Sequence, residues 1–229
     1  MTTMPNRSPV RQWIWFAALS FPTLGTVSAN AQGFERDYSK YLRPIIFVLP
    51  AAPKAGGKFT AKLDILVDGT VQLPVSVDPD DAEMTKSANE AARFWVFAPD
   101  LTADCKPGPR SGKISFEYGN GDGKSWVELP ALQGIPRNQY RYDVVNDGTD
   151  IMSPSYEAKR GIRRGKVTIA MKLMPDGSSS EPVVYLAFPR SRGFMAAAVE
   201  GAKRSSVKFL EPIDRPFLCA LKPYTFQQE

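Results

Sequence analysis

Two segments of this sequence repeat one another at a constant spacing, and this internal repeat limits the fold more than any other feature. Gly57 aligns with Gly165, Asp68 and Gly69 align with Asp176 and Gly177, and Pro74 aligns with Pro182, all without a gap. After a few inserted residues the match resumes, with residues 95–99 aligned to residues 207–212. Because glycine, turn and proline positions keep the same register, we infer a tandem duplication. Any fold for this chain is therefore one unit built twice.

Each copy begins with a strand and a tight turn. Apolar residues alternate with polar ones over residues 59–67 and again over residues 167–173, and a period of two indicates a strand with one buried face. The Asp-Gly pair that follows supplies the positive φ of a hairpin turn. A second short strand is predicted over residues 71–77 and 182–186. Each of these strands contains a proline, which cannot donate a ladder hydrogen bond, so each should lie at a sheet edge or kink there.

The period then changes to that of a helix. Asp81 and its neighbour Asp80 can cap a helix whose apolar residues recur at three- and four-residue steps from residue 84 to residue 95. In the second copy Ser191 can cap an equivalent helix, with its apolar stripe over residues 194–202. Both stripes are wide enough to cover one face of a sheet.

A final strand, predicted over residues 113–118 and 217–221, closes each copy. The unit is then strand, strand, helix, strand, and we predict an α+β fold. Two such units are expected, over residues 32–135 and 136–229.

The N-terminal segment has the pattern of a secretory signal peptide. Residues 1–11 carry two arginines and no acidic residue, and an apolar stretch follows over residues 13–27. Ala29 and Ala31 stand at the two small-residue positions of an A-x-A cleavage site. We expect residues 1–31 to be a signal peptide that is cleaved after Ala31, which predicts a periplasmic protein.

The alternative is that this segment stays as an uncleaved membrane anchor. A spanning helix needs about 20 mainly apolar residues. Pro22, Gly25 and Asn30 interrupt the run. Cleavage is therefore the favoured interpretation, and no spanning helix is expected after it.

With its elements in this order, the chain resembles the C-terminal domain of the TonB family. The family pattern runs from a Pro-x-Tyr-Pro stretch through Gly-x-Val, Asp-Gly and an alanine-rich helix to Trp-x-Phe-x-Pro. In the second copy residues 154–161 lead into Gly165, although Glu157 stands where the family has its second proline. In the first copy residues 95–99 keep the aromatic motif, whereas the segment before Gly57 departs from the pattern.

The resemblance implies a non-enzymatic domain of envelope transport that binds the short box segment of outer-membrane receptors by strand pairing. It also implies force transmission from an inner-membrane motor. Only about two dozen residues separate the signal region from the first repeat, and at ~3.3 to 3.6 Å per residue they cannot span the periplasm. We therefore expect the binding activity of the family without the motor activity.

The partner segment is expected to add to the last strand of either unit, because an edge strand offers unpaired N–H and C=O groups. The candidate residues are Lys113, Ser115, Phe116 and Glu117 in the first copy and Phe217, Cys219 and Leu221 in the second.

The distribution of charge suggests an alternative. Residues 32–135 carry 12 basic and 14 acidic side chains, whereas residues 136–229 carry 15 and 10. The densest basic cluster consists of Lys159, Arg160, Arg163, Arg164 and Lys166. The chain could be a structural envelope scaffold whose repeats pair edge to edge and whose basic half binds anionic envelope components. The simpler interpretation is that this cluster solvates a loop and the start of a strand.

The two cysteines occupy nearly equivalent places in the copies. Cys105 follows Pro99 and Cys219 follows Pro212 at similar distances along the chain. In an oxidising compartment two cysteines can pair, so an interdomain disulfide is one expectation. The other is two free thiols, with Cys219 buried as a small apolar residue.

Catalysis and metal binding have little support. The chain contains no histidine, the commonest general base and zinc ligand in proteins. Serine–lysine or carboxylate pairs could be assembled from Ser111, Lys113, Asp64 and Asp176, but no spacing singles them out. We predict no catalytic residue, metal, cofactor or nucleic-acid partner, and an undetected hydrolase is the remaining alternative. Trp126, expected in a polar loop, hints at a contact surface.

Overall fold

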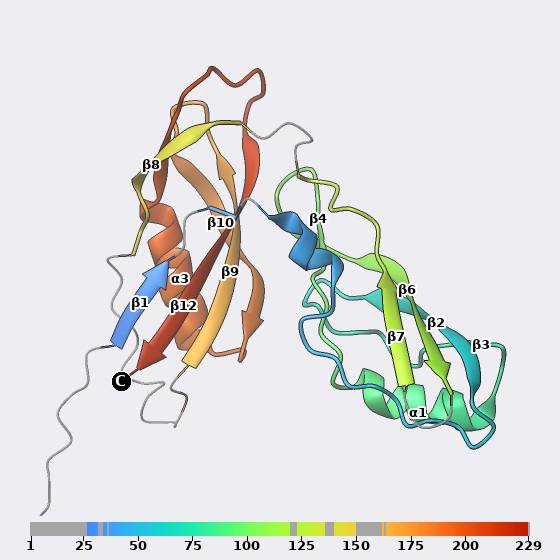
Figure 1. Ribbon diagram of the computed structural model, residues 1–229. Helices are drawn as coiled ribbons and strands as arrows, with labels where there is room; N and C mark the ends of the chain where they lie inside the picture. The colour runs from blue at the N-terminus through green and yellow to red at the C-terminus, as the bar shows by residue number, and fades with distance from the viewer. Residues whose placement is uncertain are drawn as a thin grey trace, which may run out of the picture.

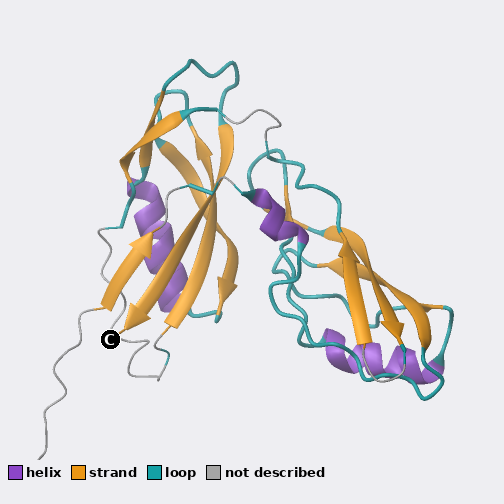
Figure 2. Ribbon diagram, in the orientation of Figure 1, coloured by secondary structure: helices purple, strands orange, loops and turns teal. Residues whose placement is uncertain are grey.

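The computed structural model describes residues 27–31, 34–35, 37–119, 123–135, 140–149, 162 and 164–228. Figure 1 shows two lobes, each with a twisted sheet and one long helix against it. Figure 2 shows the same arrangement by secondary structure, with strands predominating over helices. The predicted α+β class is confirmed.

The first unit is built on a sheet with the strand order β3-β2-β6-β7. Its strands are β2 (Gly57–Ile65), β3 (Val77–Asp78), β6 (Arg110–Tyr118) and β7 (Gly123–Glu128). Helix α1 (Ala82–Ala92) packs its buried residues on one face of this sheet, around the fully buried Trp95. Two short strands, β4 (Asp100–Leu101) and β5 (Pro107–Gly108), form a separate ladder.

The second unit has the strand order β1-β12-β9-β10. Its strands are β1 (Val27–Ala31), β9 (Arg164–Leu173), β10 (Ser179–Phe188) and β12 (Leu218–Gln228). Helix α3 (Arg192–Arg204) covers one face. β8 (Tyr142–Asn146) pairs with β11 (Ser206–Phe209), the strand that follows α3 in the sequence, in a separate two-stranded ladder.

The Asp-Gly turns have the same structure in both copies. Gly69 has φ +84° and Gly177 has φ +82°. The amide of Phe97 donates to the carbonyl of Gly69, and the amide of Val207 donates to that of Gly177, both at 2.9 Å. A Cβ on either glycine would lie within 2.4 Å of that neighbour's carbonyl oxygen. The turn thus needs glycine for its φ and for the close approach of the chain.

The helix caps also match. The carboxylate of Asp81 accepts a hydrogen bond from the amide of Met84, and the hydroxyl of Ser191 accepts one from Phe194. Both are N-caps that satisfy a free amide of the first turn. Local sequence therefore determined where each helix begins.

Three local expectations need correction. The second strand of the first copy is reduced to β3, because the chain around Pro74 leaves the ladder, whereas β10 continues past Pro182 through a bulge. The bridges Thr70–Val96 and Ser178–Ser206 make Val96 equivalent to Ser206, two residues from the predicted alignment. Trp126 lies in strand β7 rather than in a loop, and it is 44% exposed.

A third cluster of buried residues joins the two units. Ala98, Leu101 and Leu132 from the first unit pack against Ala170 and other residues of the second. Cys105 and Cys219 form a disulfide in this cluster, with their Cα atoms 5.1 Å apart. The Tyr185 hydroxyl, in the same cluster, donates to the carbonyl of Pro99 at 2.7 Å.

The units therefore meet through side chains and a covalent bond. In the part of the chain that the structure describes, no ladder pairs a strand of one unit with a strand of the other. The edge-to-edge pairing expected for a scaffold is wrong. The predicted first unit, residues 32–135, begins too early, because Phe34 packs in the core of the second unit, whose sheet also contains β1.

Candidate peptide-binding edge

The outer edge of β12 already carries a strand from the other end of the chain. β1 pairs antiparallel with the last part of β12, so that Val27 lies opposite Gln228 and Ala31 opposite Tyr224. On its other side β12 pairs with β9 along almost its whole length. Figure 1 shows β1, in blue, beside the red β12. This edge can therefore accept an added strand.

The direction of each backbone group on β12 follows from one hydrogen bond. The amide of Glu35 donates to the carbonyl of Leu221 at 2.8 Å, so the polar backbone groups of Leu221 point outward, away from β9. Because this direction alternates along an antiparallel strand, those of Pro223, Thr225 and Gln227 also point outward. Pro223 has no N–H, so the outer edge lacks a donor at that position.

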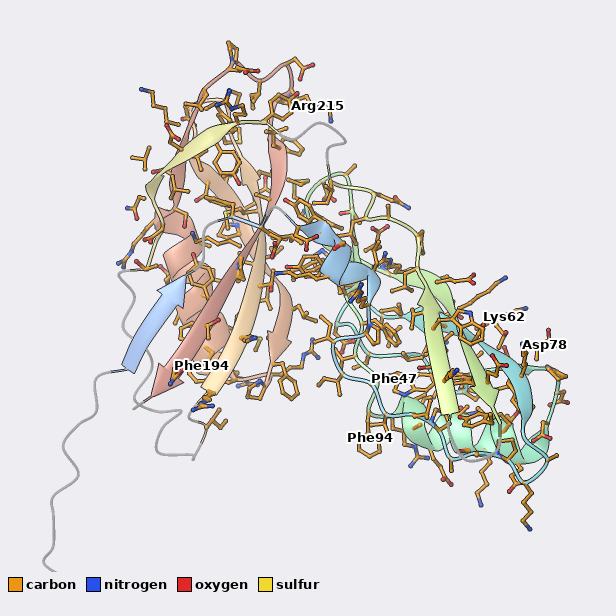
Figure 3. All side chains as sticks on the ribbon, viewed as in Figure 1. Phe47, Lys62, Asp78, Phe94, Phe194 and Arg215 are labelled. Carbon is orange, nitrogen blue, oxygen red and sulfur yellow. A yellow bond between two sulfur atoms is a disulfide. The ribbon has the colours of Figure 1, made fainter. Side chains whose placement is uncertain are left out.

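Aromatic side chains hold this part of β12 against the core. Tyr224 and Phe226 are fully buried, and Phe226 stacks on Phe194 of α3 with ring centroids 4.7 Å apart. Figure 3 labels Phe194 near the end of β12. Thr225 and Gln227 face the opposite side, where Thr225 is half-buried and Gln227 exposed. An added strand would therefore pair with a rigid backbone.

A buried lysine lies in the same row of core-facing residues. Lys222 is 0% exposed, and its ammonium makes no hydrogen bond to any described residue. The ammonium lies 4.7 Å from the centroid of the Phe34 ring and 5.6 Å from that of Tyr224. Burial lowers the pKa of Lys222 to about 8, although the charge of Asp147 opposes that change.

The first-copy candidates do not lie at an open edge. Lys113, Ser115, Phe116 and Glu117 belong to β6, which pairs with β2 on one side and β7 on the other. The expectation that these residues accept a partner strand is wrong, because β7 takes the edge. Its polar, largely exposed sequence gave only weak alternation, so the sequence did not reveal it as a strand.

The second-copy candidates lie close to the edge but not at its open part. Cys219 is in the disulfide, and Leu221 is held by Glu35. Phe217 precedes β12, and the centroid of its ring lies 4.9 Å from the Lys172 ammonium. The predicted strand ended at residue 221 and so left out residues 224–228, with which β1 pairs. Lys222 and Pro223 interrupt the apolar pattern there, although the alternation of Tyr224 and Phe226 could have indicated that the strand continues.

The basic cluster is only partly described. Lys159, Arg160 and Arg163 lie outside the described residues. Arg164 and Lys166 are exposed on β9, opposite Gln227 and Thr225 respectively. Residues opposite each other in a ladder share a face, so these two cations lie on the same face as Thr225 and Gln227.

The residues considered for catalysis have structural partners. The Ser111 hydroxyl donates to the carboxylate of Asp64 at 2.9 Å on an exposed face, and the carboxylate of Asp176 accepts from Ser178 within its own turn. Within the described ranges, no group of three His, Cys, Asp or Glu side chains could hold a metal ion.

No helix among the described residues has the length and apolarity to cross a membrane. Comparison with protein-family models, with curated proteins and with solved structures returned no match.

Proposed function

We propose that this chain is an exported, periplasmic binding protein related to the TonB C-terminal domain, which captures an extended segment of an envelope protein by adding it to the outer edge of β12. The carrying observation is the pairing of β1 with residues 224–228. A segment almost 200 residues away in sequence pairs with that edge as an antiparallel strand, which is the geometry that strand addition uses.

The neighbouring charges favour an acidic partner segment. Strands in a sheet lie about 4.8 Å apart, so side chains of an added strand would lie about 10 Å from Arg164 and Lys166 on β9. That distance is close to the Debye length of about 8 Å at physiological salt. We expect a partner whose residues opposite Thr225 and Gln227 are Asp or Glu.

The experiment uses the exported, processed chain labelled with ¹⁵N. Two synthetic peptides of six residues are added: one alternates Glu with Val, and the other alternates Lys with Val. We expect the acidic peptide to shift the amide resonances of Thr225 and Gln227 most strongly, and its binding to weaken as salt rises.

Two substitutions at one position separate backbone pairing from side-chain contact. Thr225→Pro removes an outward N–H without removing a donor to β9, as Pro223 already does two residues earlier, whereas Thr225→Ala keeps that N–H. We expect Thr225→Pro to weaken peptide binding roughly tenfold, the size of one hydrogen bond, and Thr225→Ala to change it less than about twofold. Equal effects of the two substitutions, or no resonance shift with either peptide, would contradict strand addition at this edge.

A further inference from the structure

The strand that fills the β12 edge coincides with the last five residues of the predicted signal peptide. β1 comprises Val27–Ala31, and the predicted cleavage follows Ala31. The next residues described, Phe34 and Glu35, would remain in the mature protein. The expected processing site therefore falls between two contacts of the chain with β12, the ladder of β1 and the hydrogen bond of Glu35.

β12 itself is divided at the corresponding place. Pro223 offers no outward N–H, and it separates the carbonyl of Leu221, which accepts from Glu35, from the ladder that begins at Tyr224. Phe34 is 5% exposed and packs in the core of the second unit. Loss of β1 would therefore leave the Phe34–Glu35 anchor in place and uncover only residues 224–228.

We propose that β1, the end of the signal peptide (the leader), occupies the same edge of β12 that the partner segment would bind. The uncleaved chain then folds with this edge covered, and the processed chain has it open. This inference rests on the proposed signal peptide and on the proposed use of the β12 edge. It adds that a segment of this chain competes with the partner, and that signal-peptide removal controls access.

Pairing would also protect the cleavage site. Ala29 and Ala31, the small residues of the A-x-A pattern, both lie in the ladder with β12. A peptidase must bind that stretch in its own active site, which it cannot do while the stretch is paired. Cleavage therefore has to occur before β1 can pair with β12, and a chain that folds uncleaved remains closed.

Amide hydrogen exchange tests this within one strand. The full uncleaved chain is compared with the exported chain, whose N-terminus is verified by mass spectrometry to be Gln32. The amides of Thr225 and Gln227 point toward β1, whereas those of Tyr224 and Phe226 point toward β9 and serve as internal controls. We expect Thr225 and Gln227 to exchange at least about tenfold faster in the processed chain, and the controls to be unchanged.

A matched pair of substitutions in the uncleaved chain removes the effect of chain length. By the same alternation, Asn30 faces Thr225 with its N–H directed at β12, whereas the N–H of Ala29 is directed away. Asn30→Pro removes the N–H that donates to the Thr225 carbonyl, so it should weaken the pairing of β1 and speed exchange of the Thr225 amide. Ala29→Pro removes an N–H that points away from β12 and should preserve the protection of Thr225. Equal exchange of Thr225 in the uncleaved and processed chains, or equal effects of the two prolines, would overturn the inference.

Peptide binding then distinguishes this inference from the proposed function. If the processed chain shows open amides but binds no added peptide, the proposed function fails while the occupancy by the leader stands. If both forms bind the acidic peptide equally, the proposed function stands and the competition by the leader is refuted.

Discussion

Lys222 should destabilise the folded protein, and replacing it with methionine should stabilise it. The side chain is fully buried, without a hydrogen-bond partner among the described residues, and its pKa falls from 10.5 to about 8. That difference corresponds to about 3 kcal/mol of unfavourable free energy in the charged form. The Phe34 ring, 4.7 Å from the ammonium, offsets part of it through a cation–π contact worth up to about 2 kcal/mol.

The net gain for Lys222→Met is therefore about 1 to 3 kcal/mol at pH 7. Methionine fills a similar volume and needs no partner, and its sulfur can contact the same aromatic rings. For a chain of this size, 1 kcal/mol shifts Tm by roughly 2 to 4 °C, so Tm should rise by roughly 2 to 12 °C. Lys222→Gln is the control, because it stays polar and should stabilise much less.

The pH dependence identifies the lysine as the cause. Because the folded pKa is lowered, the penalty is complete below pH 8 and disappears as pH rises toward the unfolded value of 10.5. The free energy of unfolding should therefore rise with pH from about 8 in the native chain and stay flat in Lys222→Met. Burial raises the pKa of Tyr41 and Tyr185, whose contribution opposes this near pH 10, so the comparison is made between about pH 8 and 9.5.

Urea denaturation at several pH values measures both effects. A Lys222→Met chain that is less stable at pH 7 would show that the buried ammonium is stabilised by interactions stronger than its desolvation. A Lys222→Met chain whose free energy of unfolding still rises above pH 8 would show that another group causes the rise.

Three further results are expected. Replacing Cys105 and Cys219 together with alanine should lower the free energy of unfolding by about 2 to 5 kcal/mol, because the bond closes a loop of 114 residues; an unchanged urea midpoint under non-reducing conditions would contradict this. Gly177→Ala should destabilise by more than about 1 kcal/mol because of its positive φ and the nearby carbonyl, whereas Gly119→Ala, which meets no atom within 4 Å, should be nearly neutral in the same calorimetric assay. Tyr185→Phe removes a hydrogen bond between the units and should lower Tm, with a free-energy loss of about 1 kcal/mol; no change in Tm would mean that this bond adds nothing to docking of the units.

Local patterns in the sequence were sufficient for the repeating unit. The alternation that precedes Asp68 and Asp176, the glycines that follow them, and the N-caps Asp81 and Ser191 all act within a few residues of one another. Such features are encoded in neighbouring side chains and need no knowledge of the rest of the chain.

The candidate site could not be predicted in the same way. The sequence placed it on the last strand of each copy, whereas in the described part of the chain the added strand β1 pairs with the last strand of the second copy. In the first copy β7, whose exposed residues show little alternation, covers β6. In the second, Pro223 and Lys222 made β12 look shorter than it is.

By itself the sequence determined that one α+β unit is built twice, because turns, caps and periodicity are short-range properties. Tertiary structure alone decided which strand edge is covered and by what. The pairing of Val27 with Gln228 and the bond between Cys105 and Cys219 join residues far apart in the chain. Such contacts depend on how distant parts of the chain pack. Pairing at a strand edge uses backbone N–H and C=O groups, which every sequence has, so the sequence does not show where it occurs.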